Sequence, residues 1–337
     1  MRRPARILGP AAALALGCNP TPSSESASAE ASESVGPTSG DGDGDGTEAE
    51  SETGETETGG TVPDLPEPPP LPEPMVVMTF NVLCSFCDPS YDPWDERVAY
   101  ISDTIARHDP DLVGLQELFT ADEVQQLLDL NPDYEALFYT DDLTDYADAT
   151  IWWRADRYAL VDSGFYWLSP APDTPFSVGF APMQFPRIVA WARLRELSTD
   201  AELLFVDTHF DNNSPSQELS APLLLERTEA ELARGEVPTI VVGDFNSRPD
   251  TTAYSILVTG VDGGLALTNS FDLADAWSVD SNQQPAPDYD VSRRIDHIFV
   301  VGDDWAVPSW VVDTWVYGAS DLHTSDHFAM AAELAPQ

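Results

Sequence analysis

The residues best suited to chemistry in this sequence follow a short apolar run in its second half. Residues 239–242 read Thr-Ile-Val-Val, which predicts a strand buried on both faces. The run stops at Gly243, and Asp244 and Asn246 follow with a spacing that places both side chains on one side of an extended chain. Open α/β sheets bind ligands beyond such strand ends. A carboxylate for a metal or proton and an amide for a phosphate oxygen are therefore expected here, although Gly, Asp and Asn also form ordinary surface turns.

Polar side chains of the same kinds stand at or beside the ends of other predicted strands. They are Asn81, Glu117, His209, Asp296 and the adjacent pair Asp326 and His327. Each alone has an ordinary structural explanation, such as a satisfied core histidine or a turn cap. Their ordered succession instead predicts one shared site. Because the set is rich in oxygen ligands and contains no cysteine, it favours one or two Mg²⁺ or Mn²⁺ ions over zinc.

The elements that must position these residues alternate between strand and helix, which is typical of an α/β arrangement. Apolar residues at spacings of three and four predict helices, and runs of β-branched and aromatic residues predict strands. Residues 260–287 are expected to be mostly loop. Helices are predicted at 95–108, from a capping box at Thr120 and Glu123, at 220–234 with Ser220 as N-cap, and at 251–257. Strands are predicted at 76–80, 112–117, 150–153, 159–168, 188–194, 203–208, 295–301 and 310–316, and in a last segment ending at Ala332.

The first 18 residues have the pattern of an export signal. Three arginines precede a short apolar run that ends at Gly17, and Cys18 follows. That run is too short to span a bilayer. It resembles a bacterial lipoprotein signal, so residues 1–18 are predicted to be a signal peptide with Cys18 as the lipidated residue. An ordinary cleaved signal with an incidental cysteine is the alternative. The expected location is the cell envelope, through a lipid anchor, or the secreted fraction.

Residues 19–74 differ in composition from the rest of the chain. They contain 14 acidic residues and no basic one, and Ser, Thr, Gly and Pro make up most of the remainder. Such a segment cannot bury enough apolar surface to offset the entropy lost on ordering. It is predicted to be a disordered linker, with residues 75–337 forming the catalytic domain.

The charge balance bears on possible partners. The chain has 59 acidic residues against 15 basic ones, and all 15 are arginine. Because nucleic-acid-binding proteins carry a basic face, no stable complex with nucleic acid is expected. A monomer is expected. The C-x-x-C pair Cys84 and Cys87 has no second pair to complete a zinc site, so a local disulfide is favoured over zinc or a redox centre.

Six short motifs, in this order and at these spacings, resemble those of the endonuclease/exonuclease/phosphatase superfamily, and further segments resemble its deadenylase-like bacterial branch. The motifs are Thr79-Phe80-Asn81-Val82, Leu115-Gln116-Glu117, Asp207-Thr208-His209-Phe210-Asp211, Gly243-Asp244-Phe245-Asn246, Arg294-Ile295-Asp296-His297-Ile298-Phe299-Val300 and Ser325-Asp326-His327-Phe328. The resemblance covers about Met75 to Leu334. It implies a DNase I-like α+β or α/β fold, a four-layer sandwich of two packed mixed β-sheets flanked by helices.

The resemblance also implies a role for each matching residue. Glu117 would be the main metal carboxylate, with Asn81 and Asp326 near the same ion. Asp244 would orient or deprotonate the attacking water. The phosphate oxygens would be contacted by Asn246 and His209. Additional candidates for substrate phosphate contact are Arg97, Arg187 and Asp211. His327, paired with Asp296, would stabilise charge on the transferring phosphoryl group.

The expected activity is therefore metal-dependent hydrolysis of a phosphoester bond in a small phosphodiester, phosphomonoester or lipid headgroup. Three alternatives stay open: an extracellular nuclease, an enzyme similar to sphingomyelinases or phospholipases, and a non-catalytic surface binding protein. Exposed aromatic loops would favour the membrane-active enzyme. The candidate aromatic residues are Phe165, Tyr166, Trp167, Trp305, Trp310 and Trp315. Departures from the family pattern, such as His297 where relatives often have tyrosine, leave substrate contacts undetermined.

Overall fold

The computed structural model describes residues 70–141, 144–181 and 185–337. The chain divides into two units, Met1–Pro68 and Pro69–Gln337, and everything below concerns the second. The predicted signal peptide, the Cys18 lipid attachment and all but the last five residues of the predicted linker lie outside the described residues and stay predictions. Among the residues that are described, no helix has the length and apolar character needed to cross a membrane.

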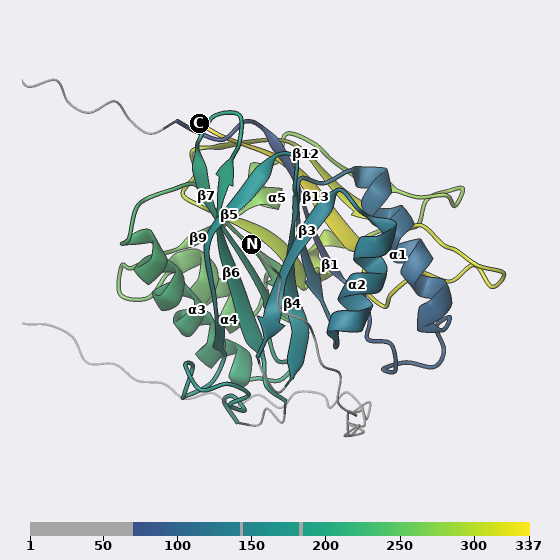
Figure 1. The fold of residues 1–337 in the computed structure, drawn as a ribbon, viewed down its shortest axis with the longest axis horizontal. Coiled ribbons are helices and arrows are strands. Elements are labelled where there is room, and N and C mark those ends of the chain that lie inside the picture. Colours follow the sequence, from purple (N-terminus) through teal and green to yellow (C-terminus); the bar gives the residue numbers. More distant parts are fainter. Residues whose placement is uncertain (1–69, 142–143, 182–184) are drawn as a thin grey trace, which may run out of the picture. The chain divides into compact units, whose positions relative to one another are not determined.

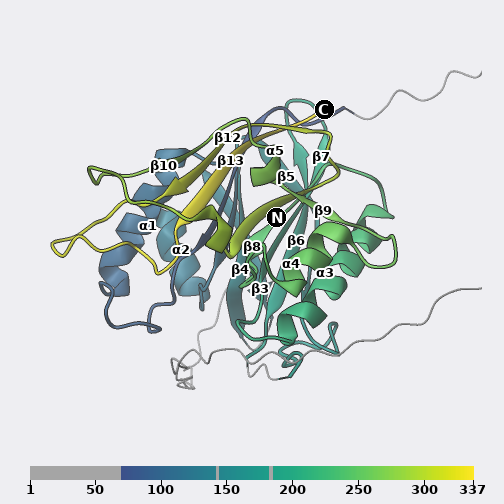
Figure 2. The ribbon, with the colours of Figure 1, turned by 180° about the vertical axis from the view of Figure 1, so that it is seen from behind.

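Two mixed β-sheets form the centre of this unit (Figures 1 and 2). The seven-stranded sheet has the order β10-β12-β13-β1-β2-β4-β3, and the six-stranded sheet has the order β5-β6-β7-β8-β11-β9. The first sheet contains β1 (Met75–Asn81), β2 (Leu112–Gln116), β3 (Tyr134–Thr140), β4 (Asp145–Arg154), β10 (Trp277–Asp280), β12 (Trp305–Asp313) and β13 (Ala329–Pro336). The second contains β5 (Tyr158–Trp167), β6 (Ile188–Glu196), β7 (Glu202–His209), β8 (Thr239–Asp244), β9 (Leu267–Asn269) and β11 (Asp296–Val301).

Helices cover the outer face of each sheet, which gives four layers. Figure 1 shows α1 and α2 outside the seven-stranded sheet, and α3 and α4 on the opposite side, outside the six-stranded sheet. The helices are α1 (Trp94–His108), α2 (Ala121–Leu130), α3 (Ser216–Leu232), α4 (Thr252–Thr259) and the short α5 (Ser270–Leu273), with a 3₁₀ turn η1 at Val291–Arg293. The predicted capping box opens α2, since Thr120 and Glu123 each bond the other's backbone N–H.

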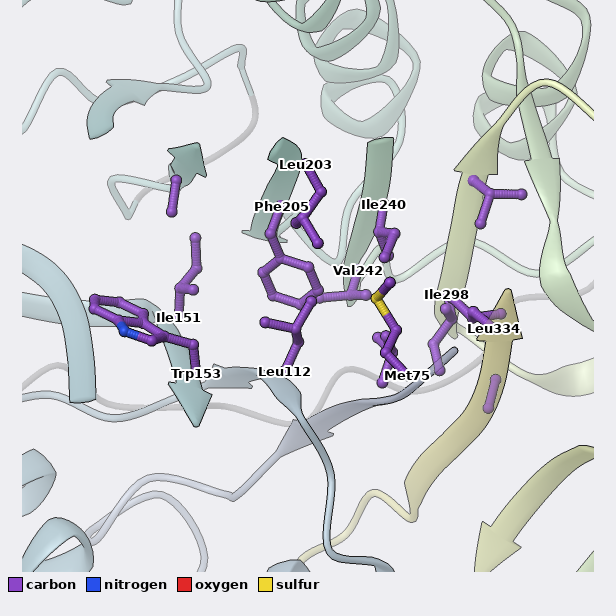
Figure 3. Packing of buried hydrophobic residues seen from close by; sticks show 14 of the residues in the cluster. Met75, Leu112, Ile151, Trp153, Leu203, Phe205, Ile240, Val242, Ile298 and Leu334 are labelled. Carbon is purple, nitrogen blue, oxygen red and sulfur yellow. The ribbon is translucent and has the colours of Figure 1, made fainter. Parts of the chain in front are cut away.

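The main hydrophobic core lies between the two sheets (Figure 3). Leu112 of β2 and Ile151 of β4 face Phe205 of β7 and Val242 of β8, and all four side chains are fully buried. Each such side chain contributes about 1.5–3 kcal/mol through removal from water. This packing fixes the two sheets against each other and so fixes their edges.

The predicted fold is confirmed, and several local predictions are corrected. Helix α3 begins at Ser216, four residues before the predicted N-cap Ser220, because Pro215 occupies the cap position and gives no side-chain capping signal. Strand β3 was not predicted. The expected loop at 260–287 contains β9, α5 and β10, which are too short to produce a clear periodic pattern.

The topology brings the predicted site residues to one edge. Strands β1 and β2 run parallel in one sheet, and β7 and β8 run parallel in the other. The hydrogen bond from Asn81 at the end of β1 to Asp244 at the end of β8 shows that both pairs end on the same side. Strands β4, β11 and β13 run antiparallel to neighbours in that set and therefore begin there. The register pairs Asp296 directly with Asp244. Residues from both halves of the chain thus meet at this edge.

Gly243 provides a test of how tightly this edge is built. Its φ is 149°, and an added Cβ would lie 2.0 Å from the Thr208 carbonyl oxygen of β7. We expect Gly243→Ala to lower the free energy of unfolding by about 2–4 kcal/mol, because the backbone carbonyl cannot move aside.

Gly263→Ala is the matched control, measured by chemical denaturation alongside Gly243→Ala. Gly263 also has a positive φ of 79°, but nothing lies within 4 Å of an added Cβ. Its replacement adds only the strain of a left-handed backbone, worth about 1–2 kcal/mol. Equal losses in the two variants would contradict the proposed clash.

Candidate active site

Asn81 links the carboxylates of the two sheets. Its Nδ2 donates to Glu117 Oε1 at 3.0 Å and to Asp244 Oδ2 at 3.1 Å, and its Oδ1 accepts from the Leu83 N–H at 3.0 Å. The Leu83 contact fixes the orientation of the amide, so its nitrogen faces the carboxylates. Asn81 therefore orients Glu117 and Asp244 by donating hydrogen bonds to them.

Glu117 is held from several sides just beyond the end of β2. Its φ of 67° lies in the left-handed region, which costs a non-glycine residue about 1–3 kcal/mol. Its Oε2 accepts from the Cys84 N–H at 2.9 Å, and its own N–H donates to Asp148 Oδ1 at 3.3 Å. Removal from water raises the pKa of Asp326, and the nearby Glu117 carboxylate raises it further. Two carboxylates that influence each other in this way are a suitable environment for a cation.

His209 is oriented by Asp148, a residue that was not predicted to belong to the site. His209 Nδ1 lies 2.8 Å from Asp148 Oδ1, and Nε2 lies 3.4 Å from Asp244 Oδ2. Arg187 Nη1 lies 3.2 Å from Asp148 Oδ2 and 2.7 Å from His209 Nδ1. Burial alone would raise the pKa of Asp148, but His209 and Arg187 outweigh it and hold the pKa below its usual value.

His327 and Asp296 form a second buried pair on the other side of Asp244. His327 Nδ1 lies 2.8 Å from Asp296 Oδ2, and its Nε2 lies 3.7 Å from Asp244 Oδ2. Burial would lower the pKa of His327, but Asp296 and Asp244 together raise it well above its ordinary value. Burial raises the pKa of Asp296, and the His327 charge opposes that rise. The pair therefore presents a positive imidazole edge toward Asp244.

Asn246 and Asp211 lie beside Asp244 with different surroundings. The Asn246 N–H donates to Asp244 Oδ1 at 2.8 Å, and Nδ2 donates to the Phe210 carbonyl oxygen at 3.1 Å. One amide hydrogen of Asn246 remains for another acceptor. Asp211 is buried, and its Oδ1 accepts from Asn213 Nδ2 at 3.3 Å. Within the described ranges, no side-chain hydrogen bond joins Asp211 to the cluster around Asp244.

Arg97 does not join the cluster as a free phosphate ligand. All five of its N–H groups donate to backbone carbonyl oxygens: those of Val82, Leu83, Cys84, Asp92 and Thr324. The side chain is buried. Arg97 therefore braces the loop after β1 against the segment that leads into Asp326. The sequence could not show these bonds because four of them reach 13 or more residues along the chain.

The C-x-x-C turn forms part of the same loop. Cys84 and Cys87 are joined by a disulfide. Their sulfur atoms lie within 4.8 Å of a Glu117 carboxylate oxygen. Disulfide sulfurs carry no thiolate charge, so this group does not form a metal site. Through the Cys84 N–H, the turn contributes to the position of Glu117 instead.

The donor set fits a hard divalent cation. Glu117 and Asp326 are the carboxylates that would hold it, since Mg²⁺ and Mn²⁺ prefer oxygen and need few protein ligands. Ligand atoms of Asp244, Asp296 and His327 also lie within 4.8 Å of one another. However, a protonated imidazole must lose its proton before it can bind a metal ion, and Asp296 and Asp244 raise the pKa of His327 and so favour the protonated ring. The Glu117 side of the cluster is therefore the better cation site.

Comparisons with known proteins agree with this arrangement. A model of the endonuclease/exonuclease/phosphatase family matches residues 78–327. A crystal structure of a protein of this family from Bacteroides thetaiotaomicron is 27% identical, covers 78% of this chain and 98% of its own, and has a TM-score of 0.66. A mannosyl-6-phosphatase from the same organism is also 27% identical, covers 77% and 99%, and has a TM-score of 0.66.

The human Nocturnin catalytic domain, with a bound sulfate, is 18% identical, covers 78% of this chain and 95% of its own, and has a TM-score of 0.58. That likeness shows the fold alone. A comparison with curated proteins gives no match. The chain belongs to the endonuclease/exonuclease/phosphatase family. Members of this superfamily are hydrolases that act on phosphoester bonds, and they generally use divalent metal ions.

Asp148 is the clearest residue that sequence reasoning missed. The predicted strand began at Thr150, whereas β4 begins at Asp145. We expect Asp148→Asn to lower kcat about 10–100-fold, because the charge that orients His209 and balances Arg187 is lost. Initial rates on a phosphomonoester, with circular dichroism as a folding check, would measure this.

Asp145→Asn is the matched control for Asp148→Asn, since Asp145 is exposed on the same strand. The control should retain wild-type kcat. A kcat for Asp148→Asn within twofold of wild type would show that Asp148 does not position His209.

His297 predicts a pH dependence of stability. Burial lowers its pKa from 6.5 to about 3. Its Nε2 lies 2.9 Å from the Ser247 carbonyl oxygen and its Nδ1 lies 3.0 Å from Asn269 Nδ2, which suits a neutral ring with its proton on Nε2. Between pH 6.5 and 3 the unfolded state binds the proton and the folded state does not. Folding free energy is therefore lost as pH falls, at about 1.4 kcal/mol per pH unit from this residue.

We expect His297→Tyr to reduce that slope, because tyrosine does not gain a proton in this range. The free energy of unfolding should be measured from pH 7 to pH 4 for both proteins. Their remaining acidic groups are the same, so the difference between the two slopes reports His297. Identical slopes would show that the ring is not buried in its neutral form.

Proposed function

We propose that this protein hydrolyses a phosphoester bond in a small substrate by in-line attack of water. The observation that carries the proposal is the convergence on Asp244. Its Oδ2 lies within 3.1 Å of Asn81 Nδ2, 3.4 Å of His209 Nε2 and 3.7 Å of His327 Nε2. A buried carboxylate surrounded by donors suits a group that orients a water and accepts its proton.

The surrounding residues supply the remaining roles. His327 keeps positive charge through its pair with Asp296 and stabilises the negative phosphoryl oxygens. Asp148 fixes the orientation of His209, whose Nε2 faces Asp244 and would contact the same phosphoryl oxygens. Asn246 offers its remaining amide hydrogen. When bound at Glu117 and Asp326, a divalent cation would supply Lewis-acid stabilisation of the phosphoryl charge.

The use of arginine supports a small substrate. The chain contains no lysine. Of the 12 arginines after residue 74, ten lie within 4.0 Å of an Asp or Glu carboxylate, and Arg97 is bonded to backbone carbonyls. The ten are Arg107, Arg154, Arg157, Arg187, Arg193, Arg195, Arg227, Arg234, Arg248 and Arg294. An extended groove that neutralises many phosphates is hard to build from such a set.

Two further observations bear on the class of substrate. The 27% identical Bacteroides thetaiotaomicron structure is named as a mannosyl-6-phosphatase, which supports a phosphomonoester as the substrate of this chain. Four aromatic side chains that might have formed membrane-contacting loops are instead buried: Tyr166, Trp167, Trp305 and Trp310. Their burial argues against a membrane-inserting lipase-like surface built from these rings.

A substrate panel tests the proposal. We expect hydrolysis of small phosphomonoesters or diesters with Mg²⁺ or Mn²⁺, loss of activity with EDTA, and at least about a 100-fold loss of kcat/KM in Glu117→Gln. Glu135→Gln, exposed on β3, is the matched control and should retain activity. Activity of Glu117→Gln equal to that of the control would refute the assignment of Glu117.

The same panel should include single-stranded RNA and DNA across a salt series. Nucleases gain affinity from many phosphate contacts, and added salt reduces that affinity steeply. We expect weak activity on polynucleotides and a shallow salt dependence on small esters. Efficient polynucleotide cleavage that collapses with salt would establish a nuclease instead, and no turnover of any ester would favour a binding protein.

A further inference from the structure

Two phenylalanine rings lie next to the catalytic carboxylates and have no role in the chemistry described above. Phe86 lies within the turn closed by the Cys84–Cys87 disulfide, and 55% of its surface is exposed. Its ring centroid lies 4.8 Å from that of Phe119, at an interplanar angle of 68°. Neither ring is part of the three hydrophobic core clusters in the described part of the chain. The pair is therefore an aromatic surface outside the core.

Contacts place this surface at the rim of the site. Phe119 follows Glu117 by two residues, and the Cys84 N–H bonds Glu117 Oε2 at 2.9 Å. The same turn thus holds both Phe86 and the carboxylate that would bind the cation. On the other side, the Phe119 ring lies 6.3 Å from Tyr146, whose hydroxyl lies 3.4 Å from Asp148 Oδ2. The aromatic surface runs from solvent toward the residue that orients His209.

In the described part of the chain, the polar groups near the rings are acidic or already hydrogen-bonded. Asp88 follows the disulfide turn, and its Oδ1 accepts from the Ser90 N–H at 2.8 Å. The nearby Arg97 has no N–H group left, as described above. A negatively charged group packed on the two phenylalanine rings would meet the Asp88 carboxylate and, among the described residues, no unpaired cation. An uncharged ring with hydroxyl groups suits the surface, since its C–H face can pack on the aromatic rings while its hydroxyls donate to carboxylates.

We propose that Phe86 and Phe119 form a platform for the sugar ring of a monophosphorylated sugar whose phosphate lies at Asp244. This proposal rests on the proposed function and adds the class of leaving group. Phe86 acts in binding and takes no part in bond breaking. Its loss should therefore raise KM for ring-bearing substrates more than it lowers kcat.

Steady-state kinetics on three esters test the platform: glucose 6-phosphate or mannose 6-phosphate, the ringless glycerol 3-phosphate, and the aryl ester 4-nitrophenyl phosphate. We expect Phe86→Ala to raise KM for the hexose phosphates about tenfold and to leave KM for glycerol 3-phosphate unchanged. Phe86→Tyr, which keeps an aromatic face, should stay within about twofold of wild type. Leu160→Ala, at an exposed apolar residue on β5, is the control and should change nothing.

Three outcomes would overturn the platform. An equal rise in KM for all three esters would mean that Phe86 acts only through the position of Glu117. A rise for the aryl ester alone would show that the surface selects aromatic leaving groups. An unchanged KM of Phe86→Ala for the hexose phosphates would show that Phe86 does not bind the sugar ring.

Calorimetry separates this proposal from the proposed function. Glucose 6-phosphate should bind the full chain in Mg²⁺ with a Kd that Phe86→Ala weakens about tenfold. Binding that depends on Phe86, without turnover of any ester, would refute the hydrolase and leave the platform standing. Turnover of esters, together with a Kd for glucose 6-phosphate that is the same in wild type and Phe86→Ala, would refute the platform and leave the hydrolase standing.

Discussion

The hydrogen bonds that Asn81 donates to Glu117 and Asp244 join the two sheets at the edge where the site lies. Asn81 ends β1 of one sheet, and Asp244 ends β8 of the other. Carboxylates removed from water are costly unless donors or cations surround them. Each sheet alone would leave its acidic groups without these partners. The packed core between the sheets is therefore the condition for the site, because it keeps the two edges at hydrogen-bonding distance.

Much of this arrangement could be predicted from the sequence because the polar residues stand where strand patterns stop. Gly243, Asp244 and Asn246 follow a run of β-branched residues, and the local signal is strong. The rest depends on distant partners that no local pattern reports. Asp148 lies inside a strand whose start was placed too late, and its role appears only when β4 comes beside β7. Arg97 looked available for phosphate until its backbone partners were known.

The site separates its charges into two groups on either side of Asp244. Asp148 holds His209 and Arg187 on one side, and Asp296 holds His327 on the other. In the proposed reaction, the carboxylate of each group takes no direct part and fixes an arginine or histidine partner that does. Such preorganised charges need little rearrangement as negative charge develops on a substrate. The acidic composition of the domain is thus compatible with an anionic substrate, because the arginine and histidine side chains of both groups lie around Asp244.

The exclusive use of arginine has a consequence for behaviour in alkali. Lysine loses its charge near pH 10.4 in water, whereas the arginine guanidinium stays charged to above about pH 12. The arginine ion pairs of this domain therefore persist between about pH 10.4 and pH 12, where lysine would lose its charge and its ion pairs would be lost. Burial also raises the pKa of Tyr146, Tyr158 and Tyr166, so these phenols stay neutral over the same range. These ion pairs and buried phenols therefore keep their charge states at pH values at which lysine would lose its charge.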